Sequence, residues 1–301
     1  MKNKNILTKL YLYQKERFPL AVLFFTTLSV VLSSAAIVYQ NDFSFSIHWI
    51  GIVLAFSAAI IFMFNVRVLD EIKDYEFDFK HHPERPVQRG LISLKSLFVV
   101  NFIFLVILFI ISIYSSLLAF LFLLIALIYS LIAGFDFFLG RRIRKRFFLY
   151  NILCLLQLLM FQVHLYLILT PKLDFLDSLL YIHFFFVLVN AGVIEVGRKI
   201  KVKSNESSGK DTYSSRMGKK KAIFLFLGII LLSYISFAYI FFSISSFNYL
   251  FLISLFILIL QMISLIFYII SDKNMAEIFM AGIGILFYLS LHIILFFGGI
   301  N

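Results

Sequence analysis

Long apolar runs dominate the chain, and short polar segments separate them. Runs of about 18 to 25 mostly apolar residues begin near Phe18, Phe45, Ser96, Ser116, Phe147, Ser178, Ala222, Phe247 and Glu277. Each run is long enough to cross a hydrocarbon core of about 30 Å as an α-helix. The pattern therefore predicts an all-α integral membrane protein with about nine transmembrane helices.

The composition supports this prediction. Hydrophobic residues make up 62% of the 301 residues, charged residues only 14%, and the mean hydropathy is +0.99. A soluble domain cannot bury that share of apolar side chains, so the bilayer must serve as solvent for much of the surface. We expect residues 1–301 to form a single transmembrane domain.

The distribution of positive charge predicts the topology. The net charge of +11 could by itself indicate nucleic-acid binding. If the chain crosses the membrane at each apolar run, however, every Lys and Arg except Lys172 lies on the same side of the membrane. These residues are in segments 1–17, 67–95, 135–146 and 195–221 and at Lys273. This is the positive-inside rule. It predicts a multi-pass protein of the cytoplasmic membrane with the N-terminus inside and the C-terminus outside, and no nucleic-acid partner.

An acidic segment follows the second apolar run. Asp70, Asp74 and Asp78 are spaced so that on one helix they point the same way, with Arg67 and Glu71 on that side as well. Like charges four residues apart repel one another. Carboxylates gathered at the membrane surface are therefore typical of a site for a hard cation such as Mg²⁺, which binds carboxylate and phosphate oxygens. The alternative is a solvated loop in which Arg67 and Lys73 neutralise the acids.

A second polar segment follows the sixth run. Glu195 and Lys199 are four residues apart at the inner end of that run, with Arg198 between them, and further lysines follow. The cations suit either anionic lipid headgroups or the phosphates of a substrate. Arg198 and Lys199 lie closest to the membrane and are the better candidates for phosphate binding.

Two other polar features are given structural interpretations. The basic run at 141–146 has no pattern of acidic partners and is interpreted as a topology determinant. His164 and His183 lie within predicted spans, where we expect neutral side chains that hydrogen-bond to neighbouring helices rather than functional groups.

Together the two segments resemble the UbiA superfamily of intramembrane prenyltransferases. The first motif of that family has an Asn or Asp and two Asp at four-residue intervals, then Arg-Pro and Gly. The matching positions here are Asp70, Asp74, Asp78, Arg85-Pro86 and Gly90. Tyr129-Ser130, near the end of the fourth run, also resembles the family.

The second motif departs from the family pattern. Family members usually carry a second cluster of aspartates after helix six, and each cluster contacts Mg²⁺. This chain has Glu195, followed by Lys199 and Lys201, with Glu206 and Asp211 further on. Glu195 either replaces the missing aspartates as a metal ligand or pairs with Lys199 and leaves the cations to hold the diphosphate.

The resemblance implies nine helices around a central lipid-accessible cavity, capped by loops 67–95 and 195–221. It implies Mg²⁺-dependent transfer of a prenyl group from a polyprenyl diphosphate to a lipophilic acceptor within the membrane. The implied catalytic and metal-binding residues are Asp70, Asp74 and Asp78, with Glu195 as a further metal ligand. The implied diphosphate-binding residues are Arg67, Lys73, Arg85, Arg198 and Lys199.

Two other functions remain open at this point. A terpene cyclase of the same family would keep the ionisation step and let the prenyl chain trap its own cation. A transporter or non-catalytic lipid-binding protein would more typically carry polar groups near the bilayer midplane and broken helices. Neither the acceptor, the prenyl chain length nor the oligomeric state follows from the residues.

Overall fold

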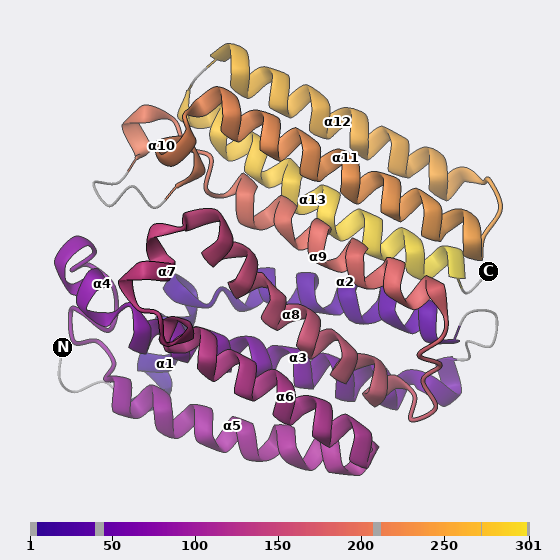
Figure 1. Ribbon diagram of the computed structural model, residues 1–301, viewed down its shortest axis with the longest axis horizontal. Coiled ribbons are helices and arrows are strands. Elements are labelled where there is room, and N and C mark those ends of the chain that lie inside the picture. The colour runs from indigo at the N-terminus through magenta and orange to yellow at the C-terminus, as the bar shows by residue number, and fades with distance from the viewer. Residues whose placement is uncertain (1–4, 40–44, 207–211, 272, 300–301) are drawn as a thin grey trace. The chain divides into compact units, whose positions relative to one another are not determined.

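The computed structural model describes residues 5–39, 45–206, 212–271 and 273–299, and these form helices with no strand among them (Figure 1). The α-helices are α1 (Ile6–Arg17), α2 (Leu20–Tyr39), α3 (Phe45–Lys73), α4 (Tyr75–His81), α5 (Leu94–Ser115), α6 (Leu117–Gly134), α7 (Arg141–Lys145), α8 (Phe147–Leu169), α9 (Ser178–Gly197), α10 (Tyr213–Met217), α11 (Lys219–Ile244), α12 (Tyr249–Ser271) and α13 (Asn274–Gly299). Two short 3₁₀ turns are η2 (Asp136–Phe138) and η3 (Lys203–Asn205).

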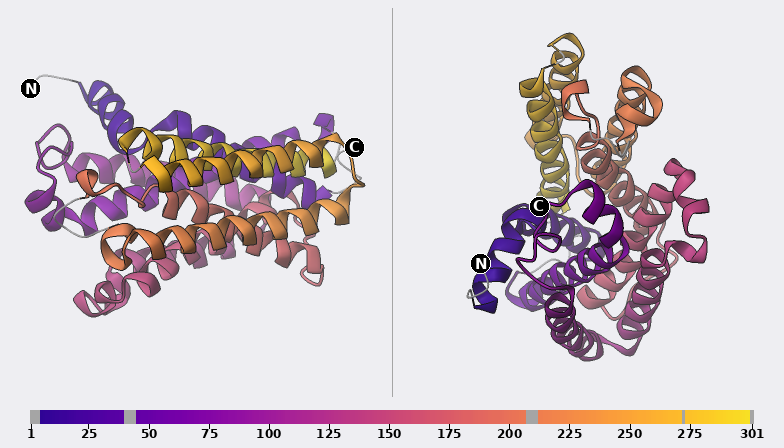
Figure 2. Two further views of the ribbon diagram at one scale, coloured as in Figure 1. Left: turned by 90° about the horizontal axis from the view of Figure 1, so that it is seen from above. Right: turned by 90° about the vertical axis from the view of Figure 1, so that its left-hand side faces the viewer.

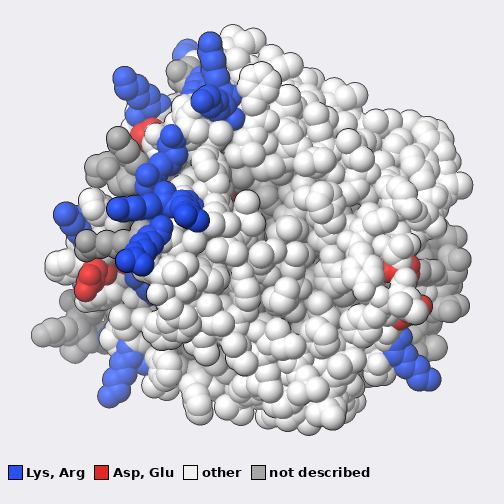
Figure 3. All heavy atoms as spheres, viewed as in Figure 1, with Lys and Arg blue, Asp and Glu red and all other residues white. Residues whose placement is uncertain are grey.

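The predicted number of spans is confirmed over the described residues. Nine helices are long and apolar enough to cross a membrane, namely α2, α3, α5, α6, α8, α9, α11, α12 and α13. In Figure 3 the charged side chains visible on the drawn face gather at helix ends, and the surface between them is formed almost entirely by uncharged residues. Such a surface suits lipid as its solvent.

The long apolar stretch from Ser96 to Gly134 is divided at a serine. Helix α5 ends at Ser115, and Ser116 adopts an extended conformation with φ −173° and ψ 159°. Its side chain accepts a hydrogen bond from the Ala119 backbone N–H at 3.0 Å, which caps α6. The predicted start of the fourth span near Ser116 is therefore confirmed.

The chain divides into two compact units. Unit 1 comprises residues 1–31 and 45–173, and unit 2 comprises residues 32–44 and 174–301. In unit 1, α3, α5, α6 and α8 pack one against the next, and in unit 2, α9 packs against α11 and α12 against α13 (Figures 1 and 2).

A core in unit 1 attaches the N-terminal helix to α3. Tyr13 of α1 and Phe18 are buried against Phe64 and Val68 of α3, and the rings of Phe18 and Phe64 meet edge to face at 5.4 Å. Val87 and the segment leading into α5 complete this cluster. The packing fixes the C-terminal end of α3, where the acidic segment begins.

Unit 2 is held by close helix packing. Phe226 of α11 is fully buried and lies against Gly197, where a β-carbon would stand only 3.1 Å from its ring. At Gly299 an added β-carbon would meet the β-carbon of Ala36 at 2.9 Å, so α13 and α2 approach closely there. These glycines permit the contacts because they have no side chain.

His164 and His183 make the predicted hydrogen bonds. In unit 1, His164 Nδ1 lies 2.9 Å from the backbone oxygen of Ala119. In unit 2, His183 Nε2 lies 3.1 Å from Ser33 Oγ, and this hydroxyl also contacts His292 Nδ1 at 2.7 Å. Both histidines therefore join neighbouring helices, as expected for buried polar groups in a bilayer.

Candidate functional site

The acidic segment in unit 1 contains a helix break at its middle aspartate. Helix α3 ends at Lys73 and α4 begins at Tyr75, with Asp74 between them at φ −96° and ψ 8°. Backbone hydrogen bonds still join Asp74 N to Asp70 O at 2.9 Å and Asp78 N to Asp74 O at 2.8 Å. The four-residue spacing is thus kept along the backbone, but Asp78 belongs to a separate short helix.

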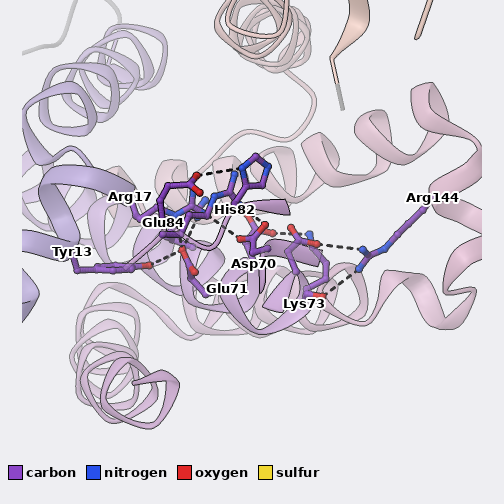
Figure 4. Close-up of polar contacts among 12 residues, drawn as sticks. Tyr13, Arg17, Asp70, Glu71, Lys73, His82, Glu84 and Arg144 are labelled. Carbon is purple, nitrogen blue, oxygen red and sulfur yellow. Dashed lines mark hydrogen bonds and ion pairs between the residues drawn. The ribbon is translucent and has the colours of Figure 1, made fainter. Parts of the chain in front are cut away.

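Asp70 and Asp74 form the outer part of the cluster. Their side chains are 37% and 36% exposed. The Lys73 ammonium lies 2.6 Å from an Asp70 carboxylate oxygen (Figure 4). Arg144 of α7 reaches an Asp74 carboxylate oxygen at 3.4 Å. Two carboxylates at the end of a span are therefore flanked by two cations.

The electrostatic surroundings of Asp74 disfavour its charged form. Burial raises the pKa of this carboxyl group above its usual range, and the nearby Asp70 and Asp78 carboxylates raise it further. Lys73 and Arg144 lower the pKa but do not cancel these effects. An added cation would therefore stabilise the ionised carboxylate.

Glu71 lies in the inner part of the cluster and has no exposed side-chain surface. Its carboxylate accepts hydrogen bonds from Arg67 at 2.7 Å and Arg17 at 2.9 Å, and from the Tyr13 hydroxyl at 3.4 Å (Figure 4). Burial and the negative charge of Glu71 raise the pKa of Tyr13, so the tyrosine stays a neutral donor. This arrangement connects α1 to the end of α3.

Asp78 is also buried, with 2% of its side chain exposed. It forms an ion pair with Arg85, and Arg17 lies 3.6 Å from its second oxygen. Asp78 therefore differs from the partly exposed Asp70 and Asp74, because its carboxylate is buried among arginines on the short helix that follows the break at Asp74. Its role as a metal ligand stays a prediction.

The basic run at 141–146 was interpreted as lacking acidic partners, but Arg144 in this run has them. Its guanidinium donates to Asp136 at 2.7 Å, and the same carboxylate accepts a hydrogen bond from the Tyr150 hydroxyl at 3.0 Å. The Lys73 ammonium lies 5.7 Å from the centre of the Tyr150 ring, within the range of a cation–π contact. Arg144 thus has acidic partners and joins the run to the acidic segment.

Four contributors were missed by sequence reasoning. Tyr13 and Arg17 lie more than fifty residues before their acidic partner, so no local spacing reveals the contact. The pair of Asp136 and Arg144 had a weak signal, since an isolated acid stands eight residues before the arginine.

The second segment, in unit 2, forms a compact ion cluster. Glu195 lies near the end of α9 with its carboxylate 2.5 Å from both Arg198 and Lys199. The Arg198 side chain is 59% exposed, whereas those of Glu195 and Lys199 are mostly covered. This geometry matches the second of the two expected roles for Glu195, the ion pair with Lys199, and leaves the ligand role as a prediction.

The chain after α9 is fixed by an acid that the sequence did not single out. Glu277 of α13 is buried and accepts hydrogen bonds from Lys201 Nζ at 2.7 Å, the Val202 N–H at 2.8 Å and the Asn205 amide at 3.1 Å. Residues 207–211 of the expected cap, including Asp211, lie outside the described residues.

Comparisons with known proteins identify the fold. A homologue of UbiA from Aeropyrum pernix K1, in its apo form, has a TM-score of 0.65 at 13% identity, covering 90% of this chain and 96% of its own. A structure of a digeranylgeranylglyceryl phosphate synthase has a TM-score of 0.61 at 15% identity, covering 97% of this chain and 99% of its own. A homologue of UbiA from Archaeoglobus fulgidus, bound to DMAPP and Mg²⁺, has a TM-score of 0.55 at 17% identity, covering 94% of this chain and 98% of its own.

No curated protein sequence matches the chain significantly. The family model described as the UbiA prenyltransferase family matches residues 22–291, which include both polar segments and every membrane-spanning helix except the ends of the first and last. The chain is therefore a multi-pass membrane protein that belongs to the UbiA prenyltransferase family.

Proposed function

We propose that this protein transfers a prenyl group from a polyprenyl diphosphate to a lipophilic acceptor in the membrane, in a reaction that depends on Mg²⁺. The observation that carries the proposal is the pair of partly exposed carboxylates, Asp70 and Asp74, flanked by Lys73 and Arg144 at the end of α3. The family and its neighbours support it, since one solved homologue is bound to DMAPP and Mg²⁺.

The donor atoms at this position fit Mg²⁺. The ion prefers oxygen ligands and typically takes one or two carboxylates, with phosphate and water oxygens in its other positions. No three His, Cys, Asp or Glu side chains in the described ranges are grouped to hold a metal by themselves, but a pair of carboxylates suffices when the substrate supplies the rest. The raised pKa of Asp74 adds to the fit, because its ionised form lacks full compensation by Lys73 and Arg144.

In this proposal Asp70 and Asp74 hold the ion, with Asp78 and Glu195 as further predicted ligands. When bound, Mg²⁺ supplies positive charge that stabilises the diphosphate as a leaving group. Lys73 binds and orients the diphosphate, and Arg198 and Lys199 stay predicted diphosphate-binding residues from the sequence.

Arg67 and Arg85 have a supporting part in the proposal. Both guanidinium groups are engaged with buried acids, Glu71 and Asp78 respectively. We therefore assign them first to holding the acidic segment in shape, and their predicted contact with the diphosphate comes second. The orientation predicted from the basic residues places this segment in the cytoplasm, with the C-terminus outside.

The proposal is tested by incubating the purified protein with labelled prenyl diphosphates and Mg²⁺, with and without a membrane lipid extract. We expect a prenylated lipid only when the extract is present. A labelled hydrocarbon formed without extract would identify a cyclase instead. If the labelled diphosphate stays intact under both conditions for every chain length tried, the proposal is wrong.

A prediction about Glu195 distinguishes its two possible roles. If Glu195 is a metal ligand, Glu195→Gln should raise the Mg²⁺ concentration needed for half-maximal activity about tenfold, and excess Mg²⁺ should restore the rate, because the lost ligand weakens ion binding. Lys199→Met, which removes the paired cation, should instead weaken diphosphate binding at every Mg²⁺ concentration. Equal losses of substrate affinity in both variants, without rescue by Mg²⁺, would assign Glu195 to the ion pair alone.

A further inference from the structure

A stacked pair of phenylalanines lies exposed where α6 leaves the membrane. The rings of Phe135 and Phe138 are 6.0 Å apart and nearly parallel at 11°, and the two residues are 64% and 77% exposed. The intervening turn is left-handed, since Asp136, Phe137 and Phe138 have φ values of 52°, 56° and 57°. Residues with a β-carbon rarely adopt this conformation. The turn thus holds two apolar rings outward at the end of a span.

The buried side of the following helix fixes the position of this turn. Ile143 is buried, and Arg144 donates to Asp136 within the turn itself. Tyr150 of α8 donates to the same carboxylate. The left-handed turn is therefore tied to α7 and α8 by polar contacts, which explains how its unfavourable backbone conformation is maintained.

The other side of the helix presents three cations. Arg142 and Lys145 are three residues apart on α7, Arg146 follows directly after the helix, and all three are exposed. None of the three has an ion pair among the described residues. Like charges this close repel one another, so an external anion would stabilise the face.

The positive-inside rule does not account for this arrangement by itself. It requires positive charge in the segment but says nothing about pairing or about aromatic neighbours. Elsewhere in unit 1, Arg17, Arg67, Arg85 and Arg89 all pair with acids. The segment 135–146 differs because unpaired cations follow directly after an exposed aromatic pair.

We propose that segment 135–146 is a binding site for anionic phospholipids. The headgroup phosphodiester contacts Arg142, Lys145 and Arg146, which stand at the depth of the lipid phosphates where the chain passes between two spans. Phe135 and Phe138 lie beneath the headgroup among the first acyl carbons, as apolar side chains of interfacial segments do. This inference is independent of the proposed prenyl transfer.

The test measures lipid binding to the purified full-length protein in neutral detergent. Dioleoyl phosphatidylglycerol and dioleoyl phosphatidylcholine are titrated separately, and bound lipid is counted by native mass spectrometry. Each basic residue near the surface should strengthen binding of the anionic lipid roughly fivefold, so Arg142→Gln/Lys145→Gln/Arg146→Gln should weaken it by on the order of a hundredfold. Binding of phosphatidylcholine should change little.

Matched variants separate this site from a general effect of charge. Lys80→Gln/Lys95→Gln/Lys203→Gln removes the same charge from exposed cytoplasmic lysines and should leave phosphatidylglycerol binding intact. Arg142→Lys/Arg146→Lys preserves the charge and should also bind normally. Should the triple variant at α7 not fold, Arg142→Gln/Arg146→Gln gives the same comparison with a smaller loss.

The aromatic pair is tested in the same assay. Phe138→Ser should weaken phosphatidylglycerol binding several-fold, whereas Phe79→Ser, at a similarly exposed ring on α4, should not. The proposal is overturned if the unmodified protein binds both lipids equally, or if the two triple variants lose affinity to the same extent.

Discussion

Replacing Asp74 with alanine is expected to reduce the rate of prenyl transfer by about 10²–10³-fold, the usual effect of removing one electrostatic contact to developing charge. The carboxylate lies between Lys73 and Arg144 at the exposed end of α3. Its loss would leave Asp70 as the remaining carboxylate of the pair. The variant is measured by the rate with labelled prenyl diphosphate and by Mg²⁺-dependent binding of inorganic diphosphate.

The same substitution should not destabilise the metal-free protein. The pKa of Asp74 is raised in the folded state, so the ionised carboxylate costs folding free energy at any pH above that raised pKa. At a pH below the pKa of the unfolded chain the group is protonated in both states and has no effect. At neutral pH the melting temperature of Asp74→Ala should therefore equal or exceed that of the unmodified protein.

The raised pKa also predicts a pH dependence of metal binding. Protons compete with Mg²⁺ for the carboxylate, so the Mg²⁺ requirement should increase as the pH falls through the pKa of Asp74, at a higher pH than for an ordinary aspartate. Glu76→Ala is the control, because it removes an exposed acid two residues away. An Asp74→Ala variant that binds diphosphate normally and melts early would show that the residue is structural.

The membrane-spanning helices could be predicted closely because their physical cause is local. An apolar run of sufficient length must form a helix in lipid to satisfy its backbone hydrogen bonds. The longest run had to be divided into two spans, and the structure divides it at Ser116, whose side chain caps α6.

The acidic segment was predicted only in part. The four-residue spacing placed Asp70 and Asp74 together. The expectation that Asp78 points the same way assumed one uninterrupted helix. After the break at Asp74, Asp78 makes tertiary contacts with Arg85 and Arg17. Periodicity carries no information about such a break.

Contacts between distant segments could not be predicted at all. Arg17 meets Glu71 across more than fifty residues, and nothing in the spacing of either residue indicates the other. The same holds for Glu277, which reaches back to Val202 from the start of the last helix. These contacts depend on how helices pack, which a single sequence does not state.

Replacing Glu71 with alanine is expected to destabilise the protein by about 3 kcal/mol, near the lower end of the cost of breaking a buried ion pair. The carboxylate is fully buried and accepts hydrogen bonds from Arg17, Arg67 and Tyr13. Without it, Arg67 loses its acidic partner. The effect stays at the lower end because both arginines are about one-fifth exposed and Arg17 keeps its contact with Asp78.

An exposed pair in the same unit gives the matched control. Glu16 and Arg89 also join α1 to the segment before α5, with oxygen and nitrogen 2.6 Å apart, but each side chain is about one-third exposed. The hydrogen bond from Arg89 lowers the pKa of Glu16, yet solvent screening limits such a pair to about 0–1 kcal/mol. Thermal unfolding in detergent should therefore show a large fall in melting temperature for Glu71→Ala and almost none for Glu16→Ala. Similar small shifts in both variants would mean that α1 is held by the apolar packing of Tyr13 and Phe18 rather than by the buried carboxylate.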